Sequence, residues 1–155
     1  MTKFLEYLHE AQKIVSVIDH IYYVSFQLIK DRRMLIKILV ESKKAIAHCI
    51  NAILQYEYLF TRIVLYQDAN LNMRSFEKRC ATLYEISESE IKKIRELFEI
   101  VKHYNNSSFE FKRDEKIVIL TDSMVSVVLT QEKIKEFLIL SKNILEKTKK
   151  RMHKG

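Results

Sequence analysis

The chain contains no proline, and its only glycine is the last of its 155 residues, Gly155. Glycine is needed where a backbone approaches a phosphate or turns sharply, as in the P-loop, the dinucleotide-binding fingerprint and the nucleophile elbow. Enzymes of these classes are therefore excluded. Because neither proline nor an internal glycine interrupts the chain, we expect few turns and long helices.

Long apolar runs and paired cysteines are also missing. No apolar run reaches the roughly 18 residues that a membrane span needs, and Glu6 lies where a signal peptide would be basic and then apolar. We therefore expect a cytoplasmic protein with no membrane partner. Cys49 and Cys80 stand alone in apolar helical stripes, without a CxxC pair. This pattern favours buried free thiols over a functional role.

The overall composition is that of a folded chain. Hydrophobic residues make up 48% of the chain and charged residues 30%, which is typical of globular and helical-bundle proteins rather than disordered ones. A chain of this length can bury a core without disulfides or metals. We predict a single domain over residues 1–155 that is mainly α. It would be an antiparallel bundle of four to five helices, with a small β-hairpin or meander before the last helix.

Apolar side chains recur every three to four residues, which predicts long amphipathic helices. The first core-facing stripe covers residues 4–29 and includes Leu28 and Ile29. The second covers residues 35–63 in a different phase, with Asp31 as the expected N-cap between the two. The second helix would then span about 34 residues, or about 50 Å at 1.5 Å per residue.

Later helix boundaries are predicted from polar residues. Asn72 is the expected cap after a polar segment, and a break near Glu85 is followed by a capping box in which Ser87 and Glu90 are three residues apart. The helix that begins there should end at residues 104–108.

The pattern then changes period. Residues 109–129 alternate or are β-branched, which predicts a small antiparallel hairpin or meander with turns at residues 114–115 and 122–123. Thr130 can cap the last helix. Residues 147–155 form a basic tail that we expect to fray.

No catalytic or metal-binding pattern stands out. A carboxylate-bridged metal centre in a bundle needs paired Glu-x-x-His motifs, and only Glu6 to His9 matches. His48 has no second ligand three or four residues away. Nothing in the sequence positions a serine, histidine and aspartate as a triad. We assign no catalytic residue, no metal ligand and no cofactor.

Positive charge is the strongest functional signal. The formal net charge of +7 would attract phosphate backbones or acidic partners. The candidate nucleic-acid-binding residues are Lys30, Arg33, Lys37 and Lys44 on one helix face, Lys112, Arg113 and Lys116 at the hairpin, and Lys135, Lys142 and Lys149 on the last helix. A solvated basic face is the alternative for these residues. The tyrosines Tyr22, Tyr23, Tyr56, Tyr58, Tyr66 and Tyr84 are assigned to the core or its edge rather than to base stacking.

The first three predicted helices, the segment from Lys102 to Arg113 and the hairpin resemble in layout small archaeal helical-bundle proteins, some of them HEPN-like. The likeness covers most of the chain. HEPN nucleases cleave RNA with an arginine and a histidine separated by four to six residues on one helix. Here Arg95 and His103 have seven residues between them, and the Lys44 to His48 pair carries the wrong cation. The resemblance therefore implies a member without nuclease activity and an interaction or RNA-binding role.

Three hypotheses follow from the sequence. The first is a non-enzymatic interaction module that binds a protein partner or a second copy, because helices this long often leave apolar surface that a homodimer covers. The second is a nucleic-acid-binding protein that uses the basic helix faces and the hairpin. The third is a HEPN-type ribonuclease with Arg95 and His103 as the acting pair.

Overall fold

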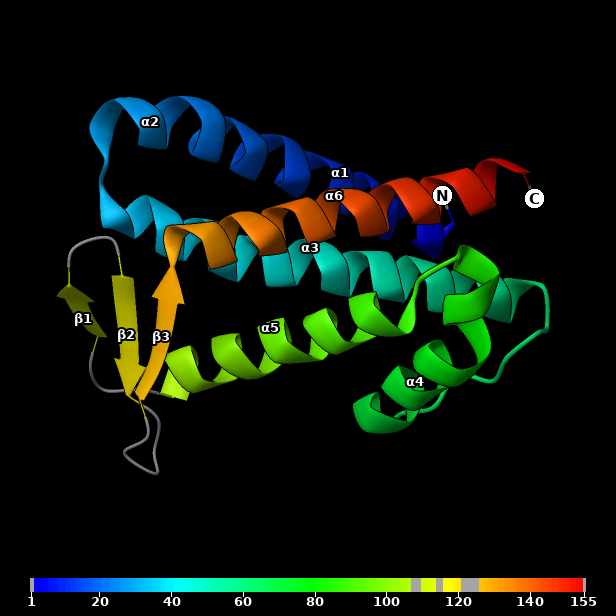
Figure 1. The fold of residues 1–155 in the computed structure, drawn as a ribbon. Coiled ribbons are helices and arrows are strands. Elements are labelled where there is room, and N and C mark those ends of the chain that lie inside the picture. Colours follow the sequence, from blue (N-terminus) through cyan, green and yellow to red (C-terminus); the bar gives the residue numbers. More distant parts are fainter. Residues whose placement is uncertain (1, 107–109, 114–115, 121–125, 155) are drawn as a thin grey trace.

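The computed structural model describes the backbone of residues 2–106, 110–113, 116–120 and 126–154, and the side chains of residues 2–105 and 128–153. Its long helices lie in three layers (Figure 1). They are α1 (Lys3–His20) on one side, α3 (Arg32–Leu59) and α6 (Gln131–Lys154) in the middle, and α5 (Glu88–Asn106) on the other side. Helix α3 packs against each of the other three. The predicted antiparallel, mainly α bundle is confirmed.

The first helical hairpin departs from a regular α-helix at one place. Between α1 and α2 (Phe26–Ile29), the segment η1 (Ile21–Ser25) is π-helical, so one extra residue enters the turn. Phe26 therefore takes the buried position that the predicted stripe gives to the residue before it. Leu28 and Ile29 are 81% and 64% exposed, and the prediction that they face the core is wrong for this reason.

The start of α3 is as predicted, but its end is not. The Asp31 side chain accepts a hydrogen bond of 2.9 Å from the backbone N–H of Arg33, which confirms Asp31 as the N-cap. The helix ends at Leu59 after 28 residues, which is shorter than predicted. Thr61 then adopts a left-handed conformation with φ of 57°. The buried side chain of Ile63 belongs to the loop that follows, so it extended the apolar pattern beyond the true helix end.

A short helical segment connects α3 to α5. It consists of α4 (Ala69–Ser75), the π-helical η2 (Phe76–Cys80) and the 3₁₀-helical η3 (Ala81–Tyr84). Asp68, not Asn72, caps α4, because its side chain accepts from two N–H groups of the first turn. The Asn72 amide instead pairs with the backbone N–H and C=O of Tyr66, both at 2.8 Å.

Two other predicted helix starts are confirmed. The Ser87 N–H donates to Glu90 Oε1 at 3.0 Å, and the Glu90 N–H donates to Ser87 Oγ at 3.1 Å. The preceding break falls at Glu85, whose φ is 57°. Thr130 Oγ1 accepts from the N–H of Lys133 at 3.1 Å, so Thr130 caps α6.

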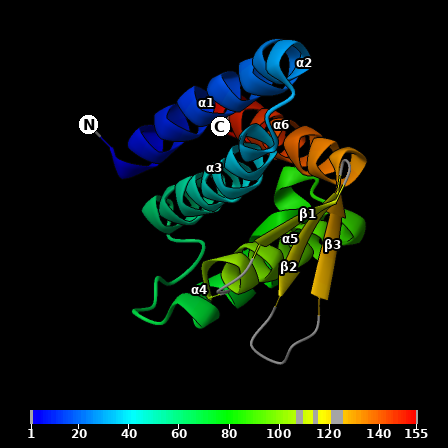
Figure 2. The ribbon, with the colours of Figure 1, turned by 90° about the vertical axis from the view of Figure 1, so that its left-hand side faces the viewer.

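A three-stranded antiparallel sheet lies at one end of the bundle (Figure 2). Its strands are β1 (Glu110–Arg113), β2 (Lys116–Leu120) and β3 (Ser126–Thr130), in the order β1-β2-β3. The predicted meander is confirmed. The predicted turn positions 114–115 and 122–123 lie outside the described residues.

Helix α6 continues to Lys154, so the segment that the sequence predicts to fray is helical. The side chains of Thr148 and Met152 are buried, and Thr148 Oγ1 donates to the C=O of Ile144 at 2.7 Å. Packing of this buried face keeps the last turns of α6 helical, although many lysines lie on its other faces. Among the described residues, no helix is both long enough and apolar enough to cross a membrane.

Candidate interaction surface

The basic ridge predicted on α3 is largely engaged with nearby acids. Arg33 Nη2 lies 2.7 Å from Asp31 Oδ2. The ammonium groups of Lys37 and Lys44 lie 3.4 Å and 3.6 Å from the same carboxylate oxygen of Glu41. Exposed pairs of this kind add little stability, but they lower the positive field that the sequence alone suggests.

The ridge on α6 is engaged with α1. Lys142 forms an ion pair with Asp19, and its ammonium lies 4.9 Å from the ring centre of Tyr23. Lys149 donates to the side chain of Gln12 at 2.9 Å. This ridge therefore follows the boundary between α1 and α6. The α3 ridge borders the other flank of α1, so the two ridges do not share one face.

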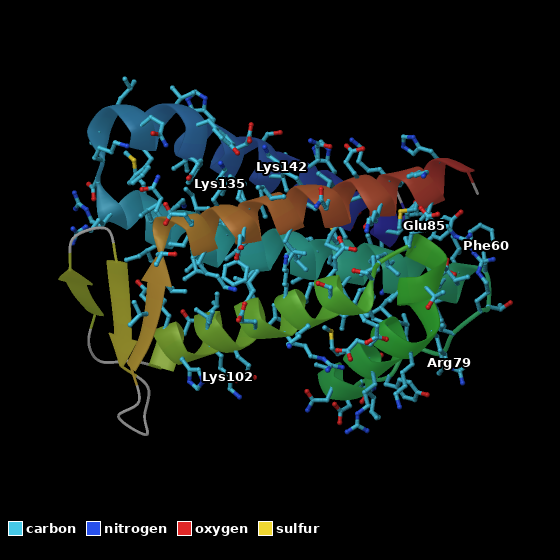
Figure 3. The ribbon with its side chains drawn as sticks, in the orientation of Figure 1. Phe60, Arg79, Glu85, Lys102, Lys135 and Lys142 are labelled. Atoms are coloured by element: carbon cyan, nitrogen blue, oxygen red, sulfur yellow. The ribbon has the colours of Figure 1, made fainter. Side chains whose placement is uncertain are left out.

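Some candidate residues do gather at the sheet end of the bundle. Lys30 follows α2 directly, at the corner before α3. Lys135 lies on the first turns of α6 (Figure 3). Arg113 and Lys116 are register partners at the end of the β1–β2 pair, beside Lys112. Figure 1 shows this end of the hairpin on the same side of the molecule as the α2–α3 corner. The side chains of these three strand residues lie outside the described part.

Arg95 and His103 are not brought together. Arg95 forms an ion pair with Glu77 of η2. His103 Nε2 lies 3.7 Å from a carboxylate oxygen of Glu99 on the same helix. Arg95 and His103 are eight residues apart, which separates them by about 12 Å along α5. Each lies beside a different carboxylate.

A buried carboxylate lies at the opposite end of the bundle from the sheet. Glu57, near the end of α3, is 0% exposed. Arg62 donates to both of its oxygens, with Nε to Oε1 at 2.8 Å and Nη2 to Oε2 at 3.1 Å. The hydroxyl of Tyr84 donates to Oε2 at 3.2 Å. The bidentate pairing and this third bond offset the cost of removing the charge from water.

This Glu57–Arg62–Tyr84 cluster determines the path of the loop after α3. It joins the last turns of α3 to the loop and to η3, across the left-handed residue Thr61. Burial, together with the neighbouring charge of Glu57, raises the pKa of the Tyr84 hydroxyl, so Tyr84 stays a donor. The guanidinium of Arg62 also lies 5.0 Å from the ring centre of Phe60.

The last turn of α3 and the loop held in this way display a set of apolar side chains. They come from one short stretch and are between 45% and 63% exposed. We call them the end surface, and its residues are Tyr58, Leu59, Phe60, Val64 and Tyr66. Figure 3 shows Phe60 at the end of the bundle far from the sheet.

The sequence analysis missed this surface. It assigned Tyr58 and Tyr66 to the core or its edge, whereas their side chains are 51% and 47% exposed; Tyr22, Tyr56 and Tyr84 are buried as expected. Tyr23 is also exposed, beside Lys142. The sequence contains only a weak signal for this surface. Asp68 caps the next helix and therefore marks the end of an irregular loop. The apolar pattern before Asp68 is uninterrupted, so it hides where the helix ends and the loop begins.

The cysteines are buried free thiols, as predicted. Burial raises the pKa of Cys49 and of Cys80 to about 12, and the charge of Glu57 adds to the effect at Cys80. Neither thiol is therefore set up as a nucleophile near neutral pH. In the described part of the chain, no three histidine, cysteine or acidic side chains are grouped so that they could hold a metal ion.

No family model, no curated protein and no solved structure matches this chain. The resemblance in layout to HEPN-like proteins stays a prediction.

Proposed function

We propose that the protein is a non-enzymatic interaction module that binds a protein partner through the end surface, with a second copy as the first candidate. The observation that carries this proposal is the exposure of five apolar side chains at the end of α3 and on the loop after it, which the pairing of Arg62 with the buried carboxylate of Glu57 holds in place. Single exposed apolar side chains are normal on a protein surface, whereas several within one short segment favour a partner site. Tyrosine, phenylalanine and arginine are also the types enriched at interfaces.

The contacts that hold the loop support this proposal. A left-handed threonine and a fully desolvated carboxylate are both costly, and such costs persist where the surrounding structure fixes one conformation. A loop that is already ordered loses little conformational entropy when it binds. The cluster of Glu57, Arg62 and Tyr84 therefore favours binding by a preformed surface.

The charge at the end surface allows a second copy to bind. The five side chains are uncharged, and the guanidinium of Arg62 is paired with Glu57. Two copies related by a two-fold axis would bring identical apolar patches together without unpaired cations in the contact. A different protein with an apolar patch would use the same features.

Site-specific photocrosslinking tests the proposal. Phe60 is replaced by benzoylphenylalanine, and the purified protein is irradiated alone and in an extract of the cells that carry its gene. We expect a crosslinked product from position 60, whose mass separates a second copy from another protein.

The matched control carries the same crosslinker at Ile139, an exposed apolar position on α6. We expect little product from this position, because Ile139 lies outside the end surface. Equal or absent crosslinking from positions 60 and 139 in both samples would remove the end surface as a docking site.

Nucleic-acid binding is the second candidate function, and the gathering of basic residues at the sheet end favours it. Anisotropy of labelled RNA and DNA at roughly 50 and 200 mM salt should show at least tenfold weakening if phosphates are contacted. Lys30→Glu with Lys135→Glu should then weaken binding, whereas Lys78→Glu, exposed on η2, should not. Absence of binding at the lower salt would mean that the charge is solvated surface.

A further inference from the structure

A pocket lies between α3, α4 and α5, on the side of α3 that faces away from α1 (Figure 1). Its walls come from three helices that are separate in the sequence, and they enclose about 290 Å³. Sites for small molecules usually enclose about 300 to 1,000 Å³, so this pocket is at the lower end of that range. It therefore suits one small molecule rather than a second helix.

The pocket is open because α4 is held by polar contacts rather than by a buried face. None of the seven residues of α4 is buried. The side chain of Asp68 caps its first turn, and the Asn72 amide pairs with the backbone of Tyr66. These hydrogen bonds fix α4 beside α3 and α5 without filling the space between them. A gap that close packing would normally remove therefore remains.

The floor of the pocket is apolar. Ile50 and Leu54 lie one turn apart on α3, and both are buried. Met73 of α4 and Phe98 of α5 are half-buried and complete the floor. A methionine side chain adapts to neighbours of different shape and makes favourable contacts with aromatic rings. This floor would therefore accommodate a flat aromatic ring.

Two asparagine side chains supply the polar part of the lining. Asn51 lies on the exposed face of α3, and Asn70 lies in the first turn of α4. Within the described part of the chain, neither side-chain amide forms a hydrogen bond, whereas that of Asn72 is engaged with Tyr66. A carboxamide carries N–H donors beside a carbonyl acceptor. The pocket therefore presents an unused donor and acceptor on each of two walls.

The lining is also uncharged. Among the described residues, no acidic or basic side chain lines the pocket. Lys43 borders it, with its ammonium 5.5 Å from the ring centre of Phe98, but Lys43 is not part of the lining. A charged ligand would lose water in this pocket without gaining an opposite charge, which is unfavourable. The lining therefore favours an uncharged ligand.

We propose that this pocket binds an adenine nucleoside without phosphate groups. Adenine is a flat, uncharged ring, and one of its edges carries an amino group beside a ring nitrogen. An asparagine carboxamide can pair with both of these groups at once. The apolar floor would contact the faces of the ring, and Asn51 or Asn70 would pair with its edge.

This site does not rest on the proposed function. The side chains of the end surface are not among those that line the pocket. The basic residues of the second candidate function gather at the sheet, whereas α4 lies near the other end of the bundle (Figure 1). Failure of the nucleoside to bind would therefore leave both of those proposals in place.

Nuclear magnetic resonance of the whole protein, labelled at its methionine methyl groups, tests the inference. Adenosine should shift the methyl signal of Met73, because a bound aromatic ring changes the shielding of nearby nuclei. The signal of Met152, buried on α6, should not move. We expect saturation with a Kd of roughly 0.1 mM or lower, as for other ligands of this size. An unchanged Met73 signal at roughly fifty times that concentration would overturn the proposal.

Two related ligands test the chemistry of recognition. Purine riboside has the same ring and sugar but lacks the amino group, so we expect it to bind at least tenfold more weakly. Adenosine monophosphate adds a negatively charged phosphate and should bind no more tightly than adenosine, since no cation lines the described pocket. Equal binding of purine riboside would rule out pairing with the adenine edge. Tighter binding of the monophosphate would rule out an uncharged ligand.

Substitutions on two walls locate the bound adenosine. Asn51→Leu and Asn70→Leu should each weaken binding, and the double variant should weaken it at least tenfold. Asn143→Leu makes the same change at an exposed position of α6 and should have no effect. Lys30→Glu with Lys135→Glu, at the sheet end, should also leave adenosine binding unchanged. Circular dichroism verifies the fold of each variant. Binding that survives the double asparagine variant, or that the two lysine substitutions abolish, would overturn the assignment to this pocket.

Discussion

At the scale of single residues, Glu57 shows how a side chain becomes buried through partners distant in sequence. The residue lies between two tyrosines near the end of α3, where the apolar pattern does not distinguish it from a solvated acid. Its partners are Arg62, five residues on, and Tyr84, 27 residues on. Helical periodicity carries no information about contacts of this range. The cluster, and with it the end surface, was therefore out of reach of the sequence.

Removal of the Arg62 cation should show how much the burial of Glu57 costs in stability. Arg62→Leu leaves Glu57 desolvated without a counter-charge. Because the Arg62 side chain is 42% exposed and its charge is partly screened by water, we expect the free energy of unfolding to fall by about 1 to 3 kcal/mol, less than for a fully buried pair. Urea unfolding at neutral pH measures this loss. Arg74→Leu, at an exposed position on α4, serves as the control and should change stability by less than about 0.5 kcal/mol.

The double variant Glu57→Leu with Arg62→Leu shows whether the single variant loses stability because an unpaired charge stays buried. Replacement of both charges by apolar groups leaves no buried ion, so part of the stability should return. A single Arg62→Leu variant as stable as the control would show that the pair does not hold the loop.

The two cysteines give a second test at this scale. Burial places the pKa of both thiols at about 12, so few thiolates exist at pH 8 and the reagent has no access to them. We expect a thiol-reactive disulfide reagent to label neither Cys49 nor Cys80 in the folded protein, and both in urea. Rapid labelling of the folded protein would mean that the helices around the thiol open readily.

At the scale of elements, the sequence predicted what local hydrogen bonds determine and missed what tertiary packing determines. Asp31, Thr130 and the Ser87–Glu90 box act over two or three residues, so their side chains identify the helix starts directly. The outward direction of Leu28 depends on a π-helical turn, which is stabilised by packing of Phe26 and has no signature in the pattern.

Glu90 links two elements and should make their stability depend on pH. Partial burial alone would raise the pKa of Glu90, but hydrogen bonds from Lys147 of α6 and from Ser87 lower it below its ordinary value. A carboxylate with a lowered folded pKa stabilises the fold above its unfolded pKa of about 4.3, and that stabilisation is lost as the pH falls through the folded pKa.

We therefore expect Glu90→Gln to reduce the loss of stability of the protein between about pH 5 and pH 3. Urea midpoints measured across this range test it. Glu88→Gln, at an exposed position in the first turn of α5, is the matched control and should keep the original pH dependence. Parallel curves for Glu90→Gln and the unsubstituted protein would contradict a lowered pKa in the fold.

At the scale of the whole molecule, the layer order explains why the end surface lies where it does. Helix α3 packs against α1, α5 and α6, so only a polar face of its middle, with Lys44 and Asn51, stays exposed. Its two ends join irregular segments, and there the apolar side chains that the layers cannot cover reach the surface. The sequence predicts the antiparallel helical bundle from periodicity. It does not predict which ends remain uncovered, since that depends on how the helices cross.

The same layer order predicts the pattern of amide hydrogen exchange. Amides of α3 should exchange most slowly, because opening this helix requires separation of both outer layers. Helices α2 and α4 should exchange fastest among the described helices, since few buried side chains hold them. Exchange of residues 147–153 distinguishes the frayed tail that the sequence predicts from the helix that the structure shows. Burial of Thr148 and Met152 predicts protection there close to that of the rest of α6, whereas a frayed basic tail would exchange as fast as α4.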